Sequence, residues 1–169
     1  MGKTPKQPGF SHVRPGGGAR MVDVSAKAAT ARSATAEAWV HVGADIADRL
    51  RRSGQVAKGE VLETARIAGI QAAKQTPALI PMCHPLALDG VEVEAELQGN
   101  RVRIVATVRC RGRTGVEMEA MTAAAVAALT VYDMVKSAGK GVEIGPVRLL
   151  AKRGGKSGPW ERTEGDEPR

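Results

Sequence analysis

The chain has very few aromatic side chains: two Trp, one Tyr and one Phe among 169 residues. Phe10 and Trp160 lie near the two ends, so the stacking platforms on which proteins bind single-stranded nucleic acid are missing. Its only two cysteines, Cys83 and Cys110, form no CxxC motif and exclude a disulfide framework. No segment has the roughly 18 consecutive apolar residues of a membrane span. Residues 1–20 lack the apolar run of a signal peptide. These absences favour a reducing, cytoplasmic compartment.

What remains is typical of a basic globular protein. Apolar residues make up 43% of the chain, enough for one domain with a core built from Ala, Val, Leu, Ile and Met. The net charge of +7 favours a polyanionic partner: nucleic acid, an anionic membrane or a phosphorylated small molecule. Residues 1–19, rich in Gly, Pro and Lys, are predicted to form a disordered arm, and residues 158–169 a flexible tail. A single domain is expected over residues 20–157.

Hydrophobic periodicity predicts an α+β fold for that domain. Strict alternation at 91–97 continues at 100–109, across a Gly-containing connection typical of a hairpin. Further strands are expected at 33–42 and 142–150, and helices at 44–52, 59–74 and 116–138. Strands with one apolar face indicate a ferredoxin-like antiparallel sheet with helices packed on one face. Small residues recur every fourth position in the two longer helices, which predicts close contact between them; they are Ala65, Gly69, Ala73, Ala120, Ala124 and Ala128.

The expected helix at 116–138 has ionisable residues only near its ends. It is apolar on all sides and must therefore be buried, so charged groups at its ends are candidates for a site. Glu117 and Glu119 lie at its start, although Thr114 and Glu117 also fit a capping box. Asp133 and Lys136 lie at its end, three residues apart, a spacing that a simple helix salt bridge would also explain.

Three other segments have residues that chemistry can use. Met82, Cys83 and His84 form a Pro-bounded loop. A single Cys–His pair is weak evidence for zinc, which needs three or four protein ligands, so a substrate-contacting loop or a packed corner is favoured. Lys58 stands at a helix start, against the helix dipole, where solvent exposure is the simpler explanation. Residues 152–158 combine cations with glycines and suit an anion cradle, or a solvated junction. Leu150 excludes a Walker A loop.

Seven segments together resemble the cyclic pyranopterin monophosphate synthase (MoaC) family of molybdenum cofactor biosynthesis. They are residues 21–27 (MVDVSAK), 58–59 (KG), 64–74 (TARIAGIQAAK), 81–85 (PMCHP), 114–120 (TGVEMEA), 132–134 (YDM) and 144–150 (IGPVRLL). The resemblance covers about residues 20–158. It implies a ferredoxin-like subunit in a homo-hexamer, a trimer of dimers, with sites at subunit interfaces. The implied substrate is 3′,8-cyclo-7,8-dihydroguanosine 5′-triphosphate, and the products are cyclic pyranopterin monophosphate and diphosphate. Neither a cofactor nor a metal is expected.

The resemblance also assigns roles, motif by motif. The catalytic residues it implies are Asp133, Lys136 and Lys58, and the substrate-binding residues are Met82, Cys83, His84, Glu117, Met118, Glu119, Arg32 and Lys152. Two departures, Arg20 and Arg113, leave this set intact. The competing hypothesis is a nucleic-acid-binding module, motivated by the basic charge, and a third is a scaffold without ligand. The favoured interpretation expects neither nucleic acid nor membrane as a partner.

Overall fold

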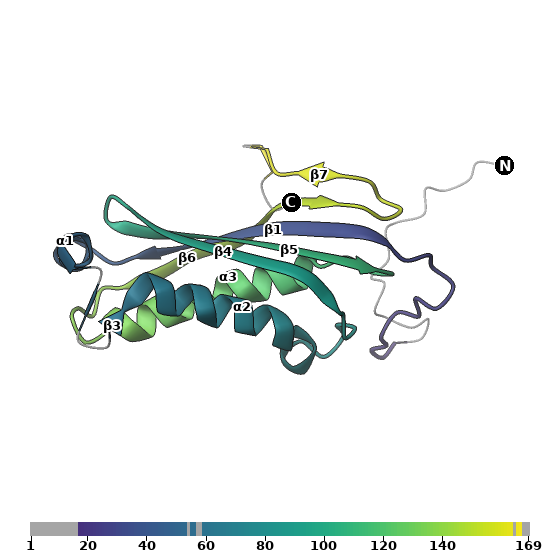
Figure 1. Ribbon diagram of the computed structural model, residues 1–169, viewed down its shortest axis with the longest axis horizontal. Coiled ribbons are helices and arrows are strands. Elements are labelled where there is room, and N and C mark those ends of the chain that lie inside the picture. The colour runs from purple at the N-terminus through teal and green to yellow at the C-terminus, as the bar shows by residue number, and fades with distance from the viewer. Residues whose placement is uncertain (1–16, 54, 57–58, 164, 167–169) are drawn as a thin grey trace.

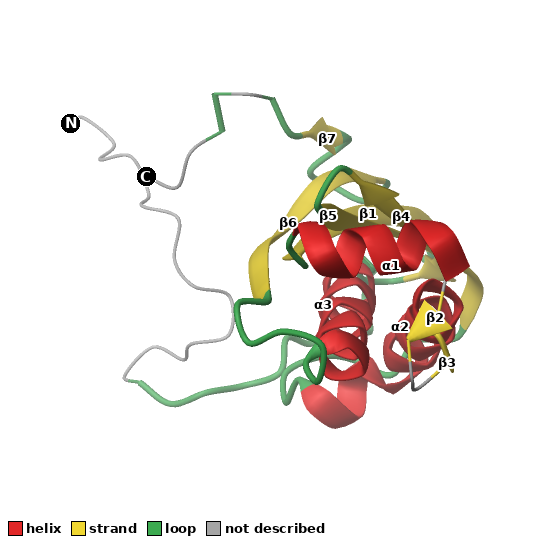
Figure 2. Cartoon of the chain, turned by 90° about the vertical axis from the view of Figure 1, so that its left-hand side faces the viewer, coloured by secondary structure: helices red, strands yellow, loops and turns green. Residues whose placement is uncertain are grey.

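The computed structural model describes residues 17–53, 55–56, 59–163 and 165–166. An antiparallel sheet forms one layer and two long helices form the other (Figure 1). Viewed along the strands, the helices lie side by side under one face of the sheet, and a third, shorter helix lies at one end (Figure 2). Most of the expected N-terminal arm, and Lys58, lie outside the described residues.

The chain order is that of a split βαβ fold. The sheet contains β1 (Thr30–His41), β4 (Leu88–Gln98), β5 (Arg101–Gly112), β6 (Glu143–Arg153) and β7 (Trp160–Glu161), in the order β4-β5-β1-β6-β7. The helices are α1 (Ala44–Ser53), α2 (Val61–Leu79) and α3 (Glu117–Val135), and β2 (Gln55–Val56) pairs with β3 (Gly59–Glu60). The path β1-α2-β4-β5-α3-β6 is the ferredoxin-like arrangement. The predicted α+β fold is confirmed.

The core lies between the sheet and the helices. On β5, Val102, Ile104 and the alternate residues that follow are buried, because successive side chains of a strand point to opposite faces. On the neighbouring β1 the residues facing the helices are mostly alanines, and Ala38 pairs with Ile104. These small side chains let α3 lie close to the centre of the sheet. α3 is long and apolar enough to cross a membrane, but more than half of it is buried inside the protein, as in a core helix.

The two long helices contact one another through the predicted small residues. A Cβ atom on Gly69 of α2 would lie 3.0 Å from the Ala123 carbonyl oxygen of α3 and 3.2 Å from both Val93 methyl groups. Ala65, Ala73 and the predicted alanines of α3 are all buried. The helices therefore approach as closely as the sequence predicts.

α2 runs five residues beyond its predicted end, through Pro77. A proline inside a helix has no N–H to donate to the carbonyl four residues earlier, here Ala73. The Thr76 hydroxyl lies 3.1 Å from that carbonyl oxygen and donates to it instead. This replacement explains why the helix continues to Leu79.

Gly69→Val is expected to lower the free energy of unfolding by about 1–3 kcal/mol, because it forces extra methyl groups into a contact without free space. Urea unfolding measures this change. Gln71→Val is the matched control, since it places the same side chain on the exposed face of α2 and should cost only about 0.5 kcal/mol of helix propensity. Equal losses for both variants would contradict the close contact.

Candidate active site

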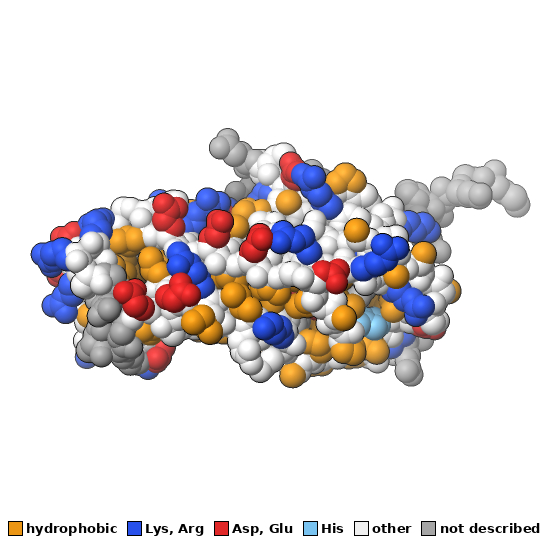
Figure 3. All heavy atoms as spheres, in the orientation of Figure 1, with side chains coloured by type: hydrophobic (Ala, Val, Ile, Leu, Met, Phe, Trp, Pro, Cys, Tyr) orange, Lys and Arg blue, Asp and Glu red, His pale blue; other side chains and the backbone are white. Residues whose placement is uncertain are grey.

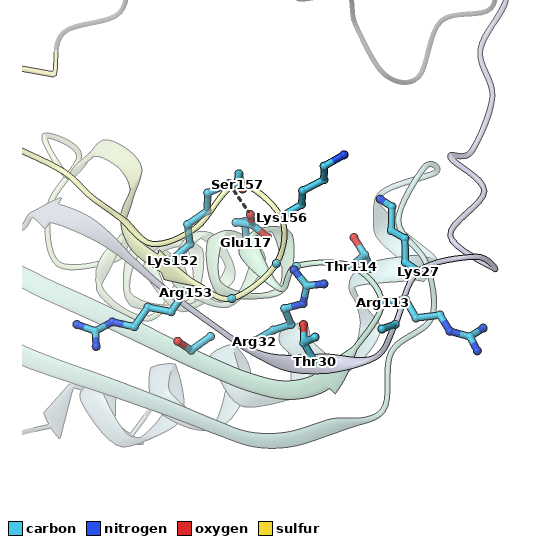
Figure 4. A pocket seen from close by; sticks show the side chains of 15 residues that line it. Lys27, Thr30, Arg32, Arg113, Thr114, Glu117, Lys152, Arg153, Lys156 and Ser157 are labelled. Atoms are coloured by element: carbon cyan, nitrogen blue, oxygen red, sulfur yellow. Dashed lines mark ion pairs between the residues drawn. The ribbon is translucent and has the colours of Figure 1, made fainter.

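A cavity of about 520 Å³ lies between the start of β1, the start of α3 and the loop that follows β6. This is the size of a small-molecule site. The cations that line it come from three segments of the chain (Figure 4); they are Lys27, Arg32, Arg113, Lys152, Arg153 and Lys156. One carboxylate, Glu117, lies among them. We refer to this space as the cationic cavity, and its charge makes it suitable for a polyanionic ligand.

Glycines bring the loop after β6 directly onto Arg32. Gly154 and Gly155 have φ angles of 88° and 82°, in the region that favours glycine. A Cβ atom on Gly155 would overlap the Arg32 guanidinium, and one on Gly154 would overlap the Ala31 carbonyl oxygen. Arg32 is also held by β5, since its Nε donates to the Gly112 carbonyl oxygen at 3.3 Å. Two backbone segments therefore fix the position of the guanidinium.

Glu117 does not cap its helix, so the capping-box prediction is wrong. The N-cap residue is Val116, and no side chain makes a cap hydrogen bond. The Glu117 carboxylate instead lies over Gly115, where a Cβ atom would overlap it, and forms an ion pair with Lys152 at 3.2 Å. A cation on β6 thus competes successfully with the backbone N–H groups of the same helix end.

A second cavity of about 340 Å³ adjoins the first. The two share Lys27, Thr114, Gly115 and Glu117. The second cavity is lined in addition by Met82, Cys83, His84, Met118, Glu119 and three apolar residues, Val22, Val24 and Leu86. We refer to it as the inner cavity. His84 is oriented by its Nε2, which donates to the Val22 carbonyl oxygen at 2.8 Å. The structure therefore brings all eight predicted substrate-binding residues to one end of the molecule.

Two ionisable groups of the inner cavity, Glu119 and Cys83, have pKa values raised toward the neutral form. Glu119 is only 3% exposed, and burial, together with the nearby Glu117 charge, raises the pKa of its carboxyl group above the usual value. Burial also raises the pKa of the Cys83 thiol, with a further contribution from Glu119. Cys83 is therefore protonated near neutral pH. A protonated thiol is a poor nucleophile.

Asp133 and Lys136 lie at the opposite end of α3. The helix rises about 1.5 Å per residue, so Asp133 is about 24 Å from Glu117 along its axis. The two side chains form an ion pair at 2.6 Å, with 55% of each exposed, and the hydrogen bond to Asp133 raises the pKa of Lys136. Within one chain, the described part of the predicted catalytic set is thus remote from both cavities.

A comparison with protein families identifies the family of the chain. A model described as the MoaC family matches residues 21–155. The chain belongs to the MoaC family. Membership implies a role in molybdenum cofactor biosynthesis, and the characterised members of the MoaC family are cyclic pyranopterin monophosphate synthases. The matched segment spans the lining of both cavities except for Lys156 and Ser157.

Sequence reasoning overlooked some of the lining. Lys27 lines both cavities and belongs to a MoaC segment quoted above, but it received no role there. Lys156 was included only as part of a cationic loop. Its signal was the Gly-Gly-Lys-Ser-Gly composition, which is typical of a loop that can lie close to an anion. Among the described residues, no group of three or more His, Cys, Asp or Glu side chains is placed to hold a metal ion.

Gly155→Ala is expected to weaken binding of GTP, used as a stable triphosphate probe, by roughly tenfold, because the new methyl group displaces the Arg32 guanidinium from a charged contact. Isothermal titration calorimetry measures the affinity. Gly158→Ala is the matched control: Gly158 also has a positive φ, 71°, but a Cβ atom there meets nothing within 4 Å. Equal affinities for the two variants would disprove the role of Gly155 in placing Arg32.

Glu119→Gln is expected to change how stability depends on pH. Folding raises the pKa of Glu119, so its contribution is fully present below the unfolded-state pKa of about 4.3 and is lost as pH rises through the folded-state pKa. The wild type should therefore lose stability relative to the variant as pH rises from about 4.3 through the raised folded-state pKa. Urea unfolding at several pH values measures the difference. The exposed Glu94→Gln is the control, and a constant difference for Glu119→Gln would contradict the assignment.

Proposed function

We propose that this protein is a cyclic pyranopterin monophosphate synthase, which converts 3′,8-cyclo-7,8-dihydroguanosine 5′-triphosphate to cyclic pyranopterin monophosphate and diphosphate. The observation that carries the proposal is the MoaC match over residues 21–155, which includes nearly all of the lining of two adjoining cavities. The properties of the two cavities support it. One is rich in cations and the other combines an apolar wall with groups that can donate or accept protons.

The cationic cavity suits the triphosphate. Lysine and arginine side chains neutralise phosphate charge in the ground state and stabilise the diphosphate that leaves as the cyclic phosphate closes. Lys152 forms an ion pair with Glu117, which holds its ammonium group in the cavity before a ligand binds. A phosphate must therefore compete with the Glu117 carboxylate for Lys152. In this proposal a phosphate oxygen takes the place of the Glu117 carboxylate, and Glu117 is released toward the inner cavity, which it also lines.

The inner cavity suits the ring system that is opened and rebuilt as a pterin. Rearrangement of a hydropurine needs proton transfers, and general acids and bases must lie within hydrogen-bond reach of the ring atoms. Glu119, with its raised pKa, is the candidate acid of this cavity, and Glu117 the candidate base. His84 donates through Nε2 to Val22, which leaves Nδ1 for the ligand.

Asp133 and Lys136 enter this proposal from a second copy of the chain, and Lys58 is the third catalytic residue that we propose from the family resemblance. One substrate cannot contact both ends of α3 in the same subunit, because they are about 24 Å apart. An assembly that places the Asp133 end of one subunit against the cavities of another removes this difficulty, and a homo-hexamer of three dimers is the form we propose. Apolar side chains exposed on the helices could be buried in contacts between subunits: Ile67 is 60% exposed and Leu129 is 56% exposed.

Nucleic-acid binding is less well supported than the synthase. In the view of Figure 3, acidic and basic side chains are interspersed over the strands, with no continuous basic surface. Several arginines are occupied within the sheet: Arg103 and Arg148 both bind the buried Glu37, and Arg109 binds Glu92. Six cations gather around one carboxylate in the concave cationic cavity, which suits a small polyanion better than a duplex or a strand.

Asp133→Asn is expected to abolish turnover nearly completely while leaving GTP binding in place. The substitution keeps the shape of the side chain and removes its charge and its capacity to accept a proton. Loss of an exposed helix ion pair alone would change stability only slightly. Product formation from the cyclised triphosphate and the thermal midpoint are measured together. Wild-type turnover would refute the catalytic role of Asp133.

Mixing two inactive variants tests whether the site is shared between subunits. Asp133→Asn and Lys152→Ala, unfolded and refolded together, should recover about one quarter of wild-type activity if each site takes Asp133 from one copy and Lys152 from the other, since one of the two sites in a mixed dimer is then intact. Each variant refolded alone is the control. No recovery in the mixture would indicate that one chain forms the whole site.

A further inference from the structure

The chain continues beyond the MoaC match and returns to the sheet. The match ends at residue 155, and β7 then pairs antiparallel with the end of β6, with Lys152 opposite Trp160 and Ala151 opposite Glu161 (Figure 1). The sequence analysis expected a flexible tail here. β7 is instead the edge strand of the sheet, next to the strand that carries Lys152.

β6 and β7 together bracket the loop that closes one side of the cationic cavity. This loop, residues 153–158, is tightened by a hydrogen bond from the Gly158 N–H to the Gly155 carbonyl oxygen at 3.3 Å. Lys156 and Ser157 lie on it and line the cavity (Figure 4). Since the paired residues Lys152 and Trp160 flank the loop, the position of β7 determines where the loop lies.

β7 pairs with β6 through only two residues, which alone hold a strand weakly. Arg162, which follows β7, adds further hydrogen bonds to β6. Its backbone N–H donates to the Leu150 carbonyl oxygen at 2.7 Å, and its side-chain Nε donates to the Leu149 carbonyl oxygen at 2.9 Å. Its guanidinium also lies over the Trp160 ring, 5.8 Å from the centroid. The other side-chain link, Arg153 to Glu161 at 3.0 Å, is exposed and contributes little. Arg162 is thus the main side-chain attachment of β7 to β6.

We infer that Arg162 is a positioning residue for the phosphate-binding cavity: it fastens β7 to β6 and thereby holds loop 153–158, with Lys156, against Arg32. Arg162 does not itself line the cationic cavity. Arg162 raises the affinity for a ligand because a loop that is already ordered loses less conformational entropy when the ligand binds. The inference rests on the proposed function only in taking a triphosphate as the occupant of the cavity; the fastening of the loop is independent of it.

Amide hydrogen exchange on the full-length protein tests the fastening directly. Arg162→Ala should accelerate exchange over residues 151–158, and the rest of the sheet should keep its protection. Arg162→Lys keeps the charge but not the planar group that reaches Leu149 and covers Trp160, so it should resemble Arg162→Ala. Arg49→Ala, on the exposed face of α1, is the control for loss of one positive charge. Unchanged exchange in the Arg162 variants would overturn the inference.

Calorimetric titration with GTP then tests the consequence for the cavity. Both Arg162 variants should bind GTP roughly fivefold more weakly than the wild type and the Arg49→Ala control, the cost of ordering the loop on binding. With the cyclised triphosphate, KM should rise by a similar factor while kcat stays unchanged, which a general loss of stability would not produce. Faster exchange with unaltered GTP affinity would overturn the positioning role. If the wild type binds no triphosphate, the proposed function fails, and the exchange experiment alone decides whether Arg162 fastens the loop.

Discussion

The close approach between α3 and the sheet is the contact on which the rest of the structure depends. Small residues contribute much of it: Ala34, Ala36 and Ala38 of β1 and Ala123, Ala124 and Ala127 of α3 are all buried in the core between the sheet and the helices. A layer of Leu or Phe would hold the helix further from the strands. Because the gap is narrow, Glu117 at the start of α3 lies within reach of Lys152 on β6, and the cationic cavity forms where these elements meet β1.

Some cations of the sheet are neutralised by a buried carboxylate, whereas others line the cationic cavity, where a ligand could reach them. On the face away from the helices, Glu37 is only 2% exposed; burial alone would raise its pKa, but hydrogen bonds from Arg148 and Arg103 lower it below the usual value. Trp39 covers part of the same cluster, with the Arg101 guanidinium 4.7 Å from its ring centroid. These arginines stabilise the sheet. Six cations and one carboxylate line the cationic cavity, so positive charge is in excess there.

Local patterns in the sequence predicted most of the fold, and long-range contacts account for what they missed. The alternation of apolar and polar residues located β4 and β5. The small residues at every fourth position of the two long helices, Gly69 among them, predicted the contact between α2 and α3. β7 has only two paired residues, too few for a periodic signal, and Arg162 holds it through contacts with β6. The capping box failed because the partner of Glu117 is Lys152, 35 positions away along the chain. The extension of α2 through Pro77 depends on one hydroxyl, that of Thr76.

Some residues of the candidate site could likewise be predicted from the sequence, and others could not. Motif resemblance predicted the eight residues that gather at the cavities. Six of them belong to two short contiguous segments, 81–85 and 114–120, and the resemblance extended to Arg32 and Lys152 outside the quoted segments. Lys27 was overlooked since its importance arises only where two cavities share a wall. The distance between Glu117 and Asp133 was implicit in the predicted helix, whose length alone keeps its two ends apart. The hypothesis of a site shared between subunits is therefore a consequence of helix geometry as much as of family membership.

The protonated state of the two thiols has a consequence for oxidative chemistry. Peroxides and disulfides react with the thiolate, so a cysteine whose pKa is raised by burial reacts slowly with both. Burial raises the pKa of Cys110 as well as that of Cys83, and Cys110 is 3% exposed. One thiol can thus line the inner cavity and another lie buried in the core while both stay slow to react with oxidants.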